Sequence, residues 1–284
     1  MEVIKVRKVI MPAVVSRALA DSRLCIGLFT LLPVGAATSA APADVAAAAD
    51  TVTAADDAAP DFAAAQWAAP VAGAVVGCLA GGVFVLANYA GLSDFACAAV
   101  TLSAALLMTG ALHEDGLADV ADGFGGGRSI ARKLAIMKDS RIGTYGGLAL
   151  IASFVLRVAA IASLAASVAP VTVVLALIAA HGASRALLPL FMRLVPPARA
   201  DGLAAGIGAV PDGAVAIALC LGVLALLPCG IWAAFVMIVL LGLLVALMRV
   251  LACAQINGQT GDVLGTVQQG GEIIILLAAS ALLS

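Results

Sequence analysis

Three aspartates, Asp115, Asp119 and Asp122, are the residues of this chain whose spacing most clearly indicates chemistry. They stand at positions i, i+4 and i+7, so a helix through them would present all three carboxylates on one face over two turns. Unpaired carboxylates stacked in this way repel one another, and a divalent cation relieves that repulsion. Ligation by oxygen alone favours Mg²⁺, with Mn²⁺ as an alternative, over Zn²⁺. We therefore expect this segment to hold a magnesium ion.

A basic stretch follows these aspartates along the chain. Glycines at 125–127 are expected to break the helix, and a further carboxylate, Asp139, lies among the cations that come after them. These cations are Arg128, Arg132, Lys133, Lys138 and Arg141. Carboxylates that hold a metal, followed by Lys and Arg side chains that clamp phosphates, suit the transfer of a phosphoryl-linked group. A solvated loop between membrane helices would explain the cations, but not three aspartates beside an apolar span. We interpret residues 113–147 as the active site.

Other polar residues lie at or inside apolar runs. His113 abuts the aspartate face, where it is either a base or ligand or only a polar group at a helix end. His181 and Arg185 are four residues apart with Ser184 between them, so one face of their helix is polar. That face either forms a pocket wall that meets a polar or anionic substrate, or makes a structural hydrogen bond between helices; we favour the pocket wall. A charge inside a span costs about 2.5–3.5 kcal/mol, so Arg157 is also expected to face the bundle interior.

Three motifs follow one another along the chain. They are H-x-D-G-L-A-D-x-x-D-G at 113–123, I-M-K-D-S-R-I-G-T-Y-G at 136–146, and T-G-D-V-L-G at 260–265 with Glu272 after it. In this order they resemble the cobalamin synthase family, the adenosylcobinamide-GDP ribazoletransferases, and the similarity extends from about Arg23 to the C-terminus. The chain departs from the family pattern at Val120 and Gln259, where Thr and an aromatic residue are expected.

The resemblance implies an enzyme of the last steps of cobalamin (vitamin B12) biosynthesis. In that reaction α-ribazole, or its 5′-phosphate, attacks the activated phosphate of adenosylcobinamide-GDP, GMP leaves, and adenosylcobalamin or its 5′-phosphate is formed. Magnesium held by the aspartates would bridge the diphosphate and stabilise the leaving GMP. The residues expected to be catalytic are His113, Asp115, Asp119, Asp122 and Asp139. The expected metal ligands are Asp115, Asp119, Asp122 and Asp262, and the residues expected to bind substrate are Arg132, Lys138, Arg141, His181, Arg185, Asp262 and Glu272.

The composition places these residues in a membrane protein. The 284 residues are 63% hydrophobic and 11% charged, with a mean hydropathy of +1.15, whereas soluble domains carry about 25% charged residues. We expect an all-α, polytopic integral membrane protein with six to seven transmembrane helices. The apolar runs are 70–90, 94–112, 144–168, 170–192, 213–228 and 231–252, and Glu272–Ser284 adds a short seventh. A net charge of −2 gives no sign of a nucleic-acid partner.

The basic residues indicate an orientation. With a cytoplasmic N-terminus, the Lys and Arg of the N-terminal segment, of the motif loop and of the later loops all fall on one side. The connections on the other side, at 88–94, 167–171 and 228–230, contain no Lys or Arg. By the positive-inside rule, the N-terminus and the motif loops face the cytoplasm of a bacterial inner membrane. The expected partners are the lipid bilayer and the two small-molecule substrates, and a homo-oligomer is left open.

The chain is expected to divide into three regions. Residues 1–35 form a basic cytoplasmic N-terminus whose apolar part, Leu24–Gly35, is too short to span a membrane and should form an interfacial or re-entrant half-helix. Residues 36–66 are a low-complexity insertion rich in Ala and Asp, expected to be disordered or loosely helical. Residues 67–284 form the transmembrane catalytic domain, with the motif loop at 113–147.

Two other functions fit part of the pattern. A CDP-alcohol phosphotransferase also has Asp residues at helical spacing around a Gly, but this chain lacks the Ala-Arg pair after its first Asp-Gly and the later Asp spacing of that motif. A cation transporter would place its acids near the bilayer midplane in broken helices. Here the acids lie at an expected cytoplasmic helix end beside a basic loop, so we rank both functions lower.

Asp262 lies in the last motif without a Lys or Arg nearby in the sequence. Its carboxylate must therefore find water, a cation or a distant basic group. The orientation puts it on the same surface as the aspartates at 115–122, and we expect it to approach them, either as a metal ligand or by meeting Lys138 or Arg141. The alternative is that Asp262 only caps a helix that begins near Val263.

Overall fold

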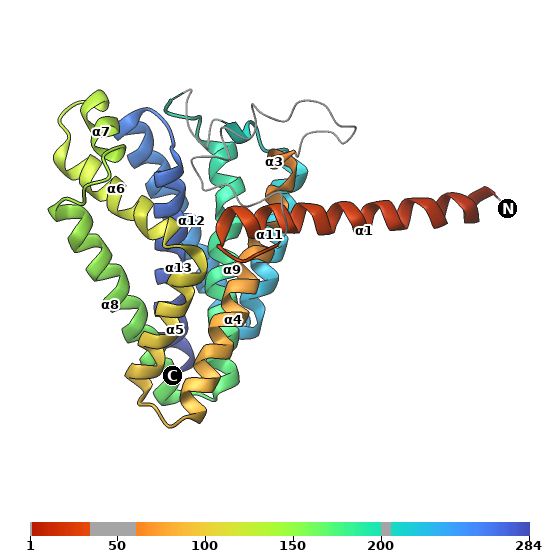
Figure 1. The fold of residues 1–284 in the computed structure, drawn as a ribbon, viewed down its shortest axis with the longest axis horizontal. Coiled ribbons are helices and arrows are strands. Elements are labelled where there is room, and N and C mark those ends of the chain that lie inside the picture. The colour runs from red at the N-terminus through yellow and green to blue at the C-terminus, as the bar shows by residue number, and fades with distance from the viewer. Residues whose placement is uncertain (1, 35–60, 200–205) are drawn as a thin grey trace.

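The computed structural model describes residues 2–34, 61–199 and 206–284 and shows an all-α protein (Figure 1). Within these ranges there is no strand, and an isolated bridge joins Pro197 to Gln259. The elements are α1 (Glu2–Phe29), α3 (Phe62–Ala65), η2 (Gln66–Ala68), α4 (Ala69–Tyr89), α5 (Asp94–Thr109), α6 (Leu112–Gly126), α7 (Ile130–Met137), α8 (Thr144–Ser167), α9 (Pro170–Leu194), α11 (Asp212–Leu226), η3 (Leu227–Cys229), α12 (Ile231–Ile256) and α13 (Gly261–Leu283). The predicted fold class is confirmed.

Six of the described helices are long and apolar enough to cross a membrane, which confirms a polytopic membrane protein. The pair α5 and α6, bent by 90°, makes a seventh span if it is counted as one broken helix. The expectation of a short last run from Glu272 to Ser284 is wrong, because α13 begins at Gly261 and has 23 residues. The polar residues Gln268, Gln269 and Glu272 lower its hydropathy, yet all three are buried inside the bundle.

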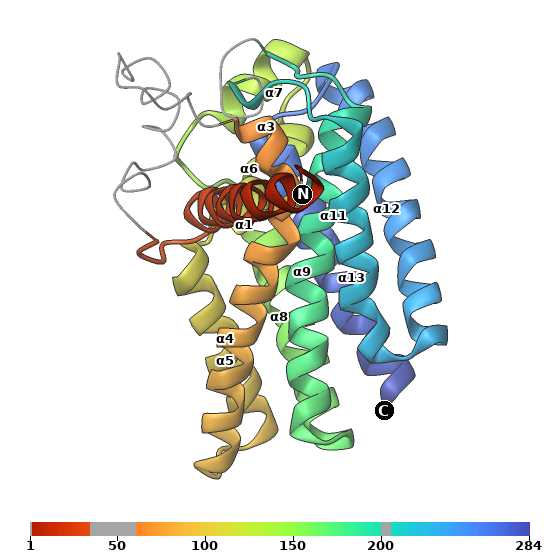
Figure 2. The same cartoon turned by 90° about the vertical axis from the view of Figure 1, so that its right-hand side faces the viewer.

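The helix α9 lies in the middle of the bundle (Figure 2). Of the 18 residues in its apolar stretch, 72% are buried inside the bundle. Glycines of α4 pack along it. A Cβ at Gly73 would lie 2.0 Å from the carbonyl oxygen of His181, and one at Gly77 would lie 2.6 Å from the Cα of Ile178. Small residues four apart allow two membrane helices to approach this closely. The packing fixes His181 and Arg185, both buried, at the centre of the molecule.

A sharp break between α5 and α6 turns the motif helix away from the preceding one (Figure 1). Gly110 and Ala111 both adopt left-handed conformations, with φ of 62° and 55°. Glycine tolerates this conformation, but an alanine there costs about 1–2 kcal/mol, so contacts elsewhere must hold it. The break allows α6 to lie against α8 and the first turns of α13.

The N-terminal segment forms one helix and not a tail followed by a half-helix. The helix α1 runs across the bundle, and its N-terminal part extends beyond the other helices (Figure 1). The apolar residues from Leu24 onward form its last turns, where Cys25 and Phe29 are buried. The chain is not helical from Thr30 to Val34. The expected half-helix over Leu24–Gly35 therefore ends at Phe29 and belongs to a longer helix.

Most of the insertion expected at 36–66 lies outside the described residues, but its last part does not. Phe62–Ala65 is helical, and together with η2 and α4 it makes one span from Phe62 to Tyr89. The Asp61 carboxylate accepts a hydrogen bond from the Ala64 amide at 2.8 Å and so caps this helix. Ala65 and Gln66 are each only 1% exposed. Assigning residues 62–66 to a loose insertion is therefore wrong, because the capped helix start packs them into the bundle.

Candidate active site

The aspartates predicted to share a helix face do so on α6. Asp115, Asp119 and Asp122 all lie within Leu112–Gly126, so their spacing places them on one side of the helix. Asp119 is the middle member, and the negative charges of Asp115, Asp122 and Asp262 all act on its carboxylate. Four carboxylates are therefore gathered where α6 meets the start of α13.

Asp262 reaches the aspartates because α6 and α13 cross at two glycines. A Cβ at Gly116 would lie 2.8 Å from the carbonyl oxygen of Asp262, and one at Gly265 would lie 3.1 Å from that of His113. The hydroxyl of Thr266 donates to the Gly116 carbonyl at 3.2 Å and ties the two helices together. The start of α13, which carries Asp262, therefore lies against the part of α6 that carries the aspartates.

The immediate partners of Asp262 differ from those expected. Arg199 Nη2 lies 3.9 Å from Asp262 Oδ2, and the Thr260 hydroxyl donates to the same oxygen at 3.1 Å. The N-cap of α13 is Thr260, whose Oγ1 accepts a hydrogen bond from the Val263 amide. The capping alternative for Asp262 is therefore wrong. The cation beside Asp262 is Arg199, whereas Arg141 pairs with Asp139.

Asp122 is engaged by the backbone of α8. Its two carboxylate oxygens accept hydrogen bonds from the amides of Gly143, at 2.7 Å, and Gly146, at 2.9 Å. These amides belong to the N-terminus of α8, where backbone N–H groups lack helical partners and a negative charge is favourable. The carboxylate comes so close because both partners are glycines: a Cβ at Gly146 would lie 2.3 Å from Asp122 Oδ2. Asp122 therefore fixes the direction in which α8 leaves the motif loop.

The basic loop after α6 is exposed. Arg141 Nη2 lies 2.6 Å from Asp139 Oδ2, and Arg141 Nε also donates to Asp139. Hydrogen bonds from the Arg141 side chain lower the pKa of Asp139 to about 2. Arg132 lies on α7 and Lys138 at its C-terminal end, and both are exposed. These side chains lie on the solvent side of the site and do not line the cavity beside the aspartates.

A second group of charges is buried deeper in the bundle. Arg157 Nη1 lies 2.8 Å from Glu114 Oε1 and 2.9 Å from Glu272 Oε1. His181 Nδ1 lies 3.1 Å from the second oxygen of Glu272. The Gln269 side-chain amide donates to Glu114 at 2.9 Å. Since α6, α8, α9 and α13 each contribute a residue, this network joins the helix that carries the aspartates to three spans.

The buried network contains three residues expected to bind substrate: His181, Arg185 and Glu272. Arg185 Nη1 donates to the carbonyl oxygen of His181 at 3.1 Å, and its side chain is 1% exposed. Glu272 also accepts a hydrogen bond from Gln268 at 2.8 Å. His181 and Glu272 bond across helices, which fits the alternative of structural contacts between helices. The hydrogen bonds of Arg185 stay within α9, and its buried Nε has no partner.

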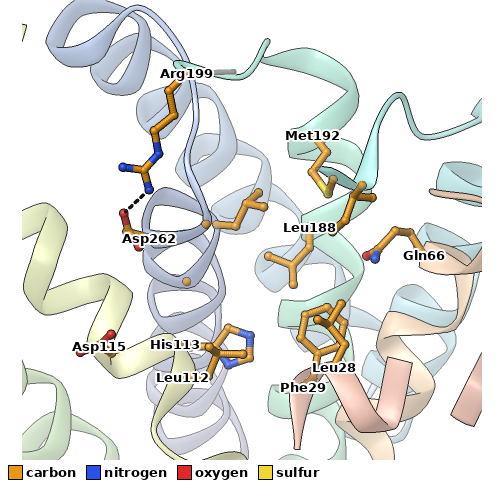
Figure 3. Close-up of a pocket in the computed structure, with 14 residues that line it drawn as sticks. Leu28, Phe29, Gln66, Leu112, His113, Asp115, Leu188, Met192, Arg199 and Asp262 are labelled. Atoms are coloured by element: carbon orange, nitrogen blue, oxygen red, sulfur yellow. Dashed lines mark ion pairs between the residues drawn. The ribbon is translucent and has the colours of Figure 1, made fainter. Parts of the chain in front are cut away.

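A cavity of about 240 Å³ lies beside the aspartates (Figure 3). Asp115 and Asp262 stand on one side of it, and Arg199 lies next to Asp262. The opposite wall is apolar and includes Leu188 and Met192 of α9. The cavity therefore has a charged side and an apolar side.

His113 lies on the wall of this cavity and stacks on Phe29 of α1, with ring centroids 5.7 Å apart. It is 3% exposed, and its Nε2 has no hydrogen-bond partner. The Nη1 of Arg199, on the same cavity, also has no partner. A buried polar atom without a partner costs about 1–3 kcal/mol. Both nitrogens thus belong to residues that line the cavity and lack a partner within the protein.

The carboxylates can be compared with the needs of a magnesium ion. Among the described residues, no three His, Cys, Asp or Glu side chains are arranged to hold one metal ion. Mg²⁺ does not require such a cage, since it usually keeps several waters and binds through one or two carboxylates plus substrate phosphates. Asp115 and Asp119 offer these two carboxylates, whereas Asp122 is bonded to backbone amides. The residues present therefore fit an ion that binds together with a diphosphate.

Some residues of the site escape sequence reasoning. Glu114, between His113 and Asp115, offers a signal because an acid next to an apolar span needs a partner. Gln268 and Gln269 also interrupt an apolar run in a recognisable way. Arg199 gives no such signal, since a single Arg in a loop is ordinary until the fold brings it to Asp262.

Comparisons with known proteins agree with the motifs. Residues 21–280 match the family model of cobalamin-5-phosphate synthase. An adenosylcobinamide-GDP ribazoletransferase of Bradyrhizobium diazoefficiens is 48% identical over 268 residues, which cover 94% of this chain and 95% of the relative. One of Mesorhizobium japonicum is 51% identical over 223 residues, 78% of this chain and 85% of the relative. No solved structure matches the chain. With a family model that covers almost all of it and relatives this similar, the chain belongs to the cobalamin-5-phosphate synthase family.

Proposed function

We propose that this membrane protein is an adenosylcobinamide-GDP ribazoletransferase. The observation that carries the proposal is that α6, with Asp115 and Asp119, crosses the start of α13, with Asp262, beside a cavity with one apolar side. A ribose hydroxyl of α-ribazole, or of its 5′-phosphate, forms an ester with the cobinamide-bound phosphate of adenosylcobinamide-GDP. The phosphoanhydride bond breaks, GMP leaves with the bridging oxygen, and adenosylcobalamin or its 5′-phosphate is formed.

Asp115 and Asp119 are the proposed holders of Mg²⁺, with Asp262 on the adjoining helix. Support comes from their oxygen donors and from the repulsion between neighbouring carboxylates, which a cation would relieve. When bound, the ion would neutralise charge that develops on the diphosphate as GMP leaves. Mn²⁺ satisfies the same donors. Asp122 has an indirect role, because its bonds to α8 hold the face of α6 in place.

The cavity residues suggest roles in handling the nucleophile. His113 is the proposed acceptor of the ribose hydroxyl proton, because its unpartnered Nε2 lies on the cavity wall near Asp115. Arg199 is proposed to bind a phosphate oxygen, since its Nη1 is also unpartnered. The exposed side chains of Arg132, Lys138 and Arg141 remain proposed contacts for the guanosine diphosphate part, from the solvent side.

Turnover by purified protein tests this function. The protein, in detergent or lipid nanodiscs, is mixed with adenosylcobinamide-GDP and α-ribazole. The products are then separated, identified and quantified by mass spectrometry. Equal amounts of GMP and adenosylcobalamin are expected, and neither in a sample of the Asp119→Asn variant. GMP release without a corrinoid product, or no turnover by well-folded protein, would refute the proposal.

We also propose that the motif end of the bundle faces the cytoplasm of a bacterial inner membrane. The connections after α4, α8 and α11, which contain no Lys or Arg, lie at the end opposite to α7 (Figures 1 and 2). This distribution follows the positive-inside rule. A cysteine introduced at Ser140 should react with an impermeant maleimide in inverted vesicles but not in intact spheroplasts, in a background where the exposed Cys78, Cys220 and Cys253 are replaced. Labelling in spheroplasts alone would reverse the orientation.

A further inference from the structure

We propose that the cavity beside the aspartates is the binding site for α-ribazole, the riboside of dimethylbenzimidazole, with its bicyclic ring against α9 and its ribose toward Asp115 and Asp262. This inference rests on the proposed function and assigns one of its two substrates to a place. It also names residues that would select the base: Leu188, Met192 and Gln66.

The volume of the cavity decides between the two substrates. At about 240 Å³ it lies just below the range of about 300–1,000 Å³ that is usual for drug-sized ligands. A benzimidazole riboside is a small molecule, at the lower end of the drug-sized range, and so fits a cavity of this volume. A corrin macrocycle with its side chains is several times larger and cannot enter. Adenosylcobinamide-GDP must therefore approach from outside the cavity, with only its diphosphate near the aspartates.

The polarity of the walls gives the orientation of the nucleoside. The side formed by Leu188 and Met192 suits a flat hydrophobic bicycle, whereas Asp115 and Asp262 lie across from it (Figure 3). Ribose hydroxyls are hydrogen-bond donors and so belong on the carboxylate side. With this orientation the attacking hydroxyl lies beside the carboxylates proposed to hold the metal and the diphosphate.

Gln66 lies on the apolar side of the cavity (Figure 3). It is 1% exposed. A benzimidazole joined to ribose through one ring nitrogen has an unprotonated second nitrogen, which accepts a hydrogen bond. The Gln66 side-chain amide can donate that bond. His113, with its unpartnered and buried Nε2, lines the middle of the cavity and is an independent sign that a polar ligand enters it.

Base selection tests the assignment, because a gain of function cannot arise from misfolding. Leu188→Ala would enlarge the apolar side, and the ratio of kcat/KM for a naphthimidazole riboside to that for the dimethylbenzimidazole riboside should rise about tenfold or more. Leu194→Ala is the matched control on the same helix, since Leu194 is exposed and does not line the cavity. The control should leave the ratio within about twofold of the wild type.

Gln66→Leu tests the other contact. Its KM for α-ribazole should rise about tenfold, while the KM for adenosylcobinamide-GDP stays within about twofold. Leu188→Ala with an unchanged base ratio would overturn the inference, as would a Gln66→Leu variant in which both KM values rise together.

Equilibrium dialysis with radiolabelled α-ribazole separates this inference from the proposed function. If the wild type binds α-ribazole and Gln66→Leu binds it about tenfold more weakly, the cavity assignment stands even where turnover fails. If turnover occurs but the wild type and Gln66→Leu bind α-ribazole equally, the proposed function survives and this assignment falls. If the wild type does not bind α-ribazole at all, the assignment is also refuted.

Discussion

Arg157 on α8 and Glu272 on α13 form an ion pair at 2.9 Å inside the bundle, with side chains only 2% and 1% exposed. The same Arg157 nitrogen also holds Glu114, the neighbour of Asp115 on α6. One guanidinium therefore connects the helix of the first motif to the helix of the last. Because both acids are buried, they depend on this cation and on nearby polar groups, which for Glu272 include His181.

Removing this cation should destabilise the protein. Arg157→Met leaves two buried carboxylates without their shared partner, and loss of one member of a buried ion pair costs about 3–5 kcal/mol. A fall in Tm should be seen by thermal unfolding in detergent. The triple variant Arg157→Met, Glu114→Gln, Glu272→Gln has no uncompensated charge at these positions and should recover much of the loss. A Tm for Arg157→Met equal to that of the wild type would contradict this account.

Removal of divalent cations should stop the reaction. With EDTA in excess, turnover should fall to background and return on addition of Mg²⁺, because the carboxylates of α6 cannot neutralise a diphosphate by themselves. Asp115→Asn and Asp119→Asn should each lower kcat while the protein inserts and unfolds normally. Mn²⁺ binding, followed by electron paramagnetic resonance, should weaken in both variants. The metal assignment is wrong if both keep wild-type turnover at saturating Mg²⁺.

Asp122 should behave differently from the other two aspartates, since its carboxylate bonds two backbone amides at the start of α8. Asp122→Ala removes both bonds and should lower stability by about 0.5–2 kcal/mol, as loss of a helix cap does. Asp119→Asn should not lower the stability in this way. Comparing denaturant midpoints of the two variants separates the roles, and equal stability of both with the wild type would exclude the capping role of Asp122.

Two adjacent glycines give a matched test of the same contact. Gly146→Ala would place a Cβ 2.3 Å from Asp122 Oδ2, whereas a Cβ at Gly147 has its nearest neighbour at 3.9 Å. Gly146→Ala should therefore lose folded yield or turnover, and Gly147→Ala should resemble the wild type. Size-exclusion profiles and initial rates report both. Equal behaviour of the two variants would show that the close approach of Asp122 is unimportant.

Shortening the segment before α3 tests where the packed domain begins. Replacing residues 36–60 by a short Gly-Ser linker should keep activity within a few-fold, because this stretch is low in complexity and outside the family motifs. Extending the deletion to Gln66 should abolish activity, since it removes the Asp61 cap and the buried Gln66. Initial rates at matched expression compare the two. Loss of activity in the shorter deletion would give this segment a function.

Helix periodicity and the order of the spans predict which residues lie together at the site. The spacing of Asp115, Asp119 and Asp122 was enough to place them on one face, and counting the spans between motifs brought Asp262 to the same end. These inferences succeed because they depend on local geometry and on the number of spans between the motifs. The same reasoning does not supply contact partners, which is why Arg199 was not expected beside Asp262.

Long-range contacts explain what sequence reasoning did not find. The partners of Asp122 are backbone amides 21 and 24 residues away, and no side-chain pattern marks a bond to an amide. The sequence does not indicate the start of α13, because Gln268, Gln269 and Glu272 look unsuited to a membrane. Bonds to Ser184, Glu114 and Arg157 on other helices offset the free-energy cost of burying these polar side chains. A hydropathy scale does not take such contacts into account.

The crossing of Gly116 with Asp262 has a consequence for how the protein is made. Residues far apart in the chain meet there: the hydrogen bond from Thr266 to Gly116 joins residues 150 positions apart. A ribosome that has released α6 must still synthesise four spans before α13 emerges. Until then Glu114 lacks its contact with α13, and the aspartates of α6 lack Asp262 as a neighbour. The proposed active site is therefore complete only after the last helix has been made, and we expect a chain truncated before α13 to be inactive.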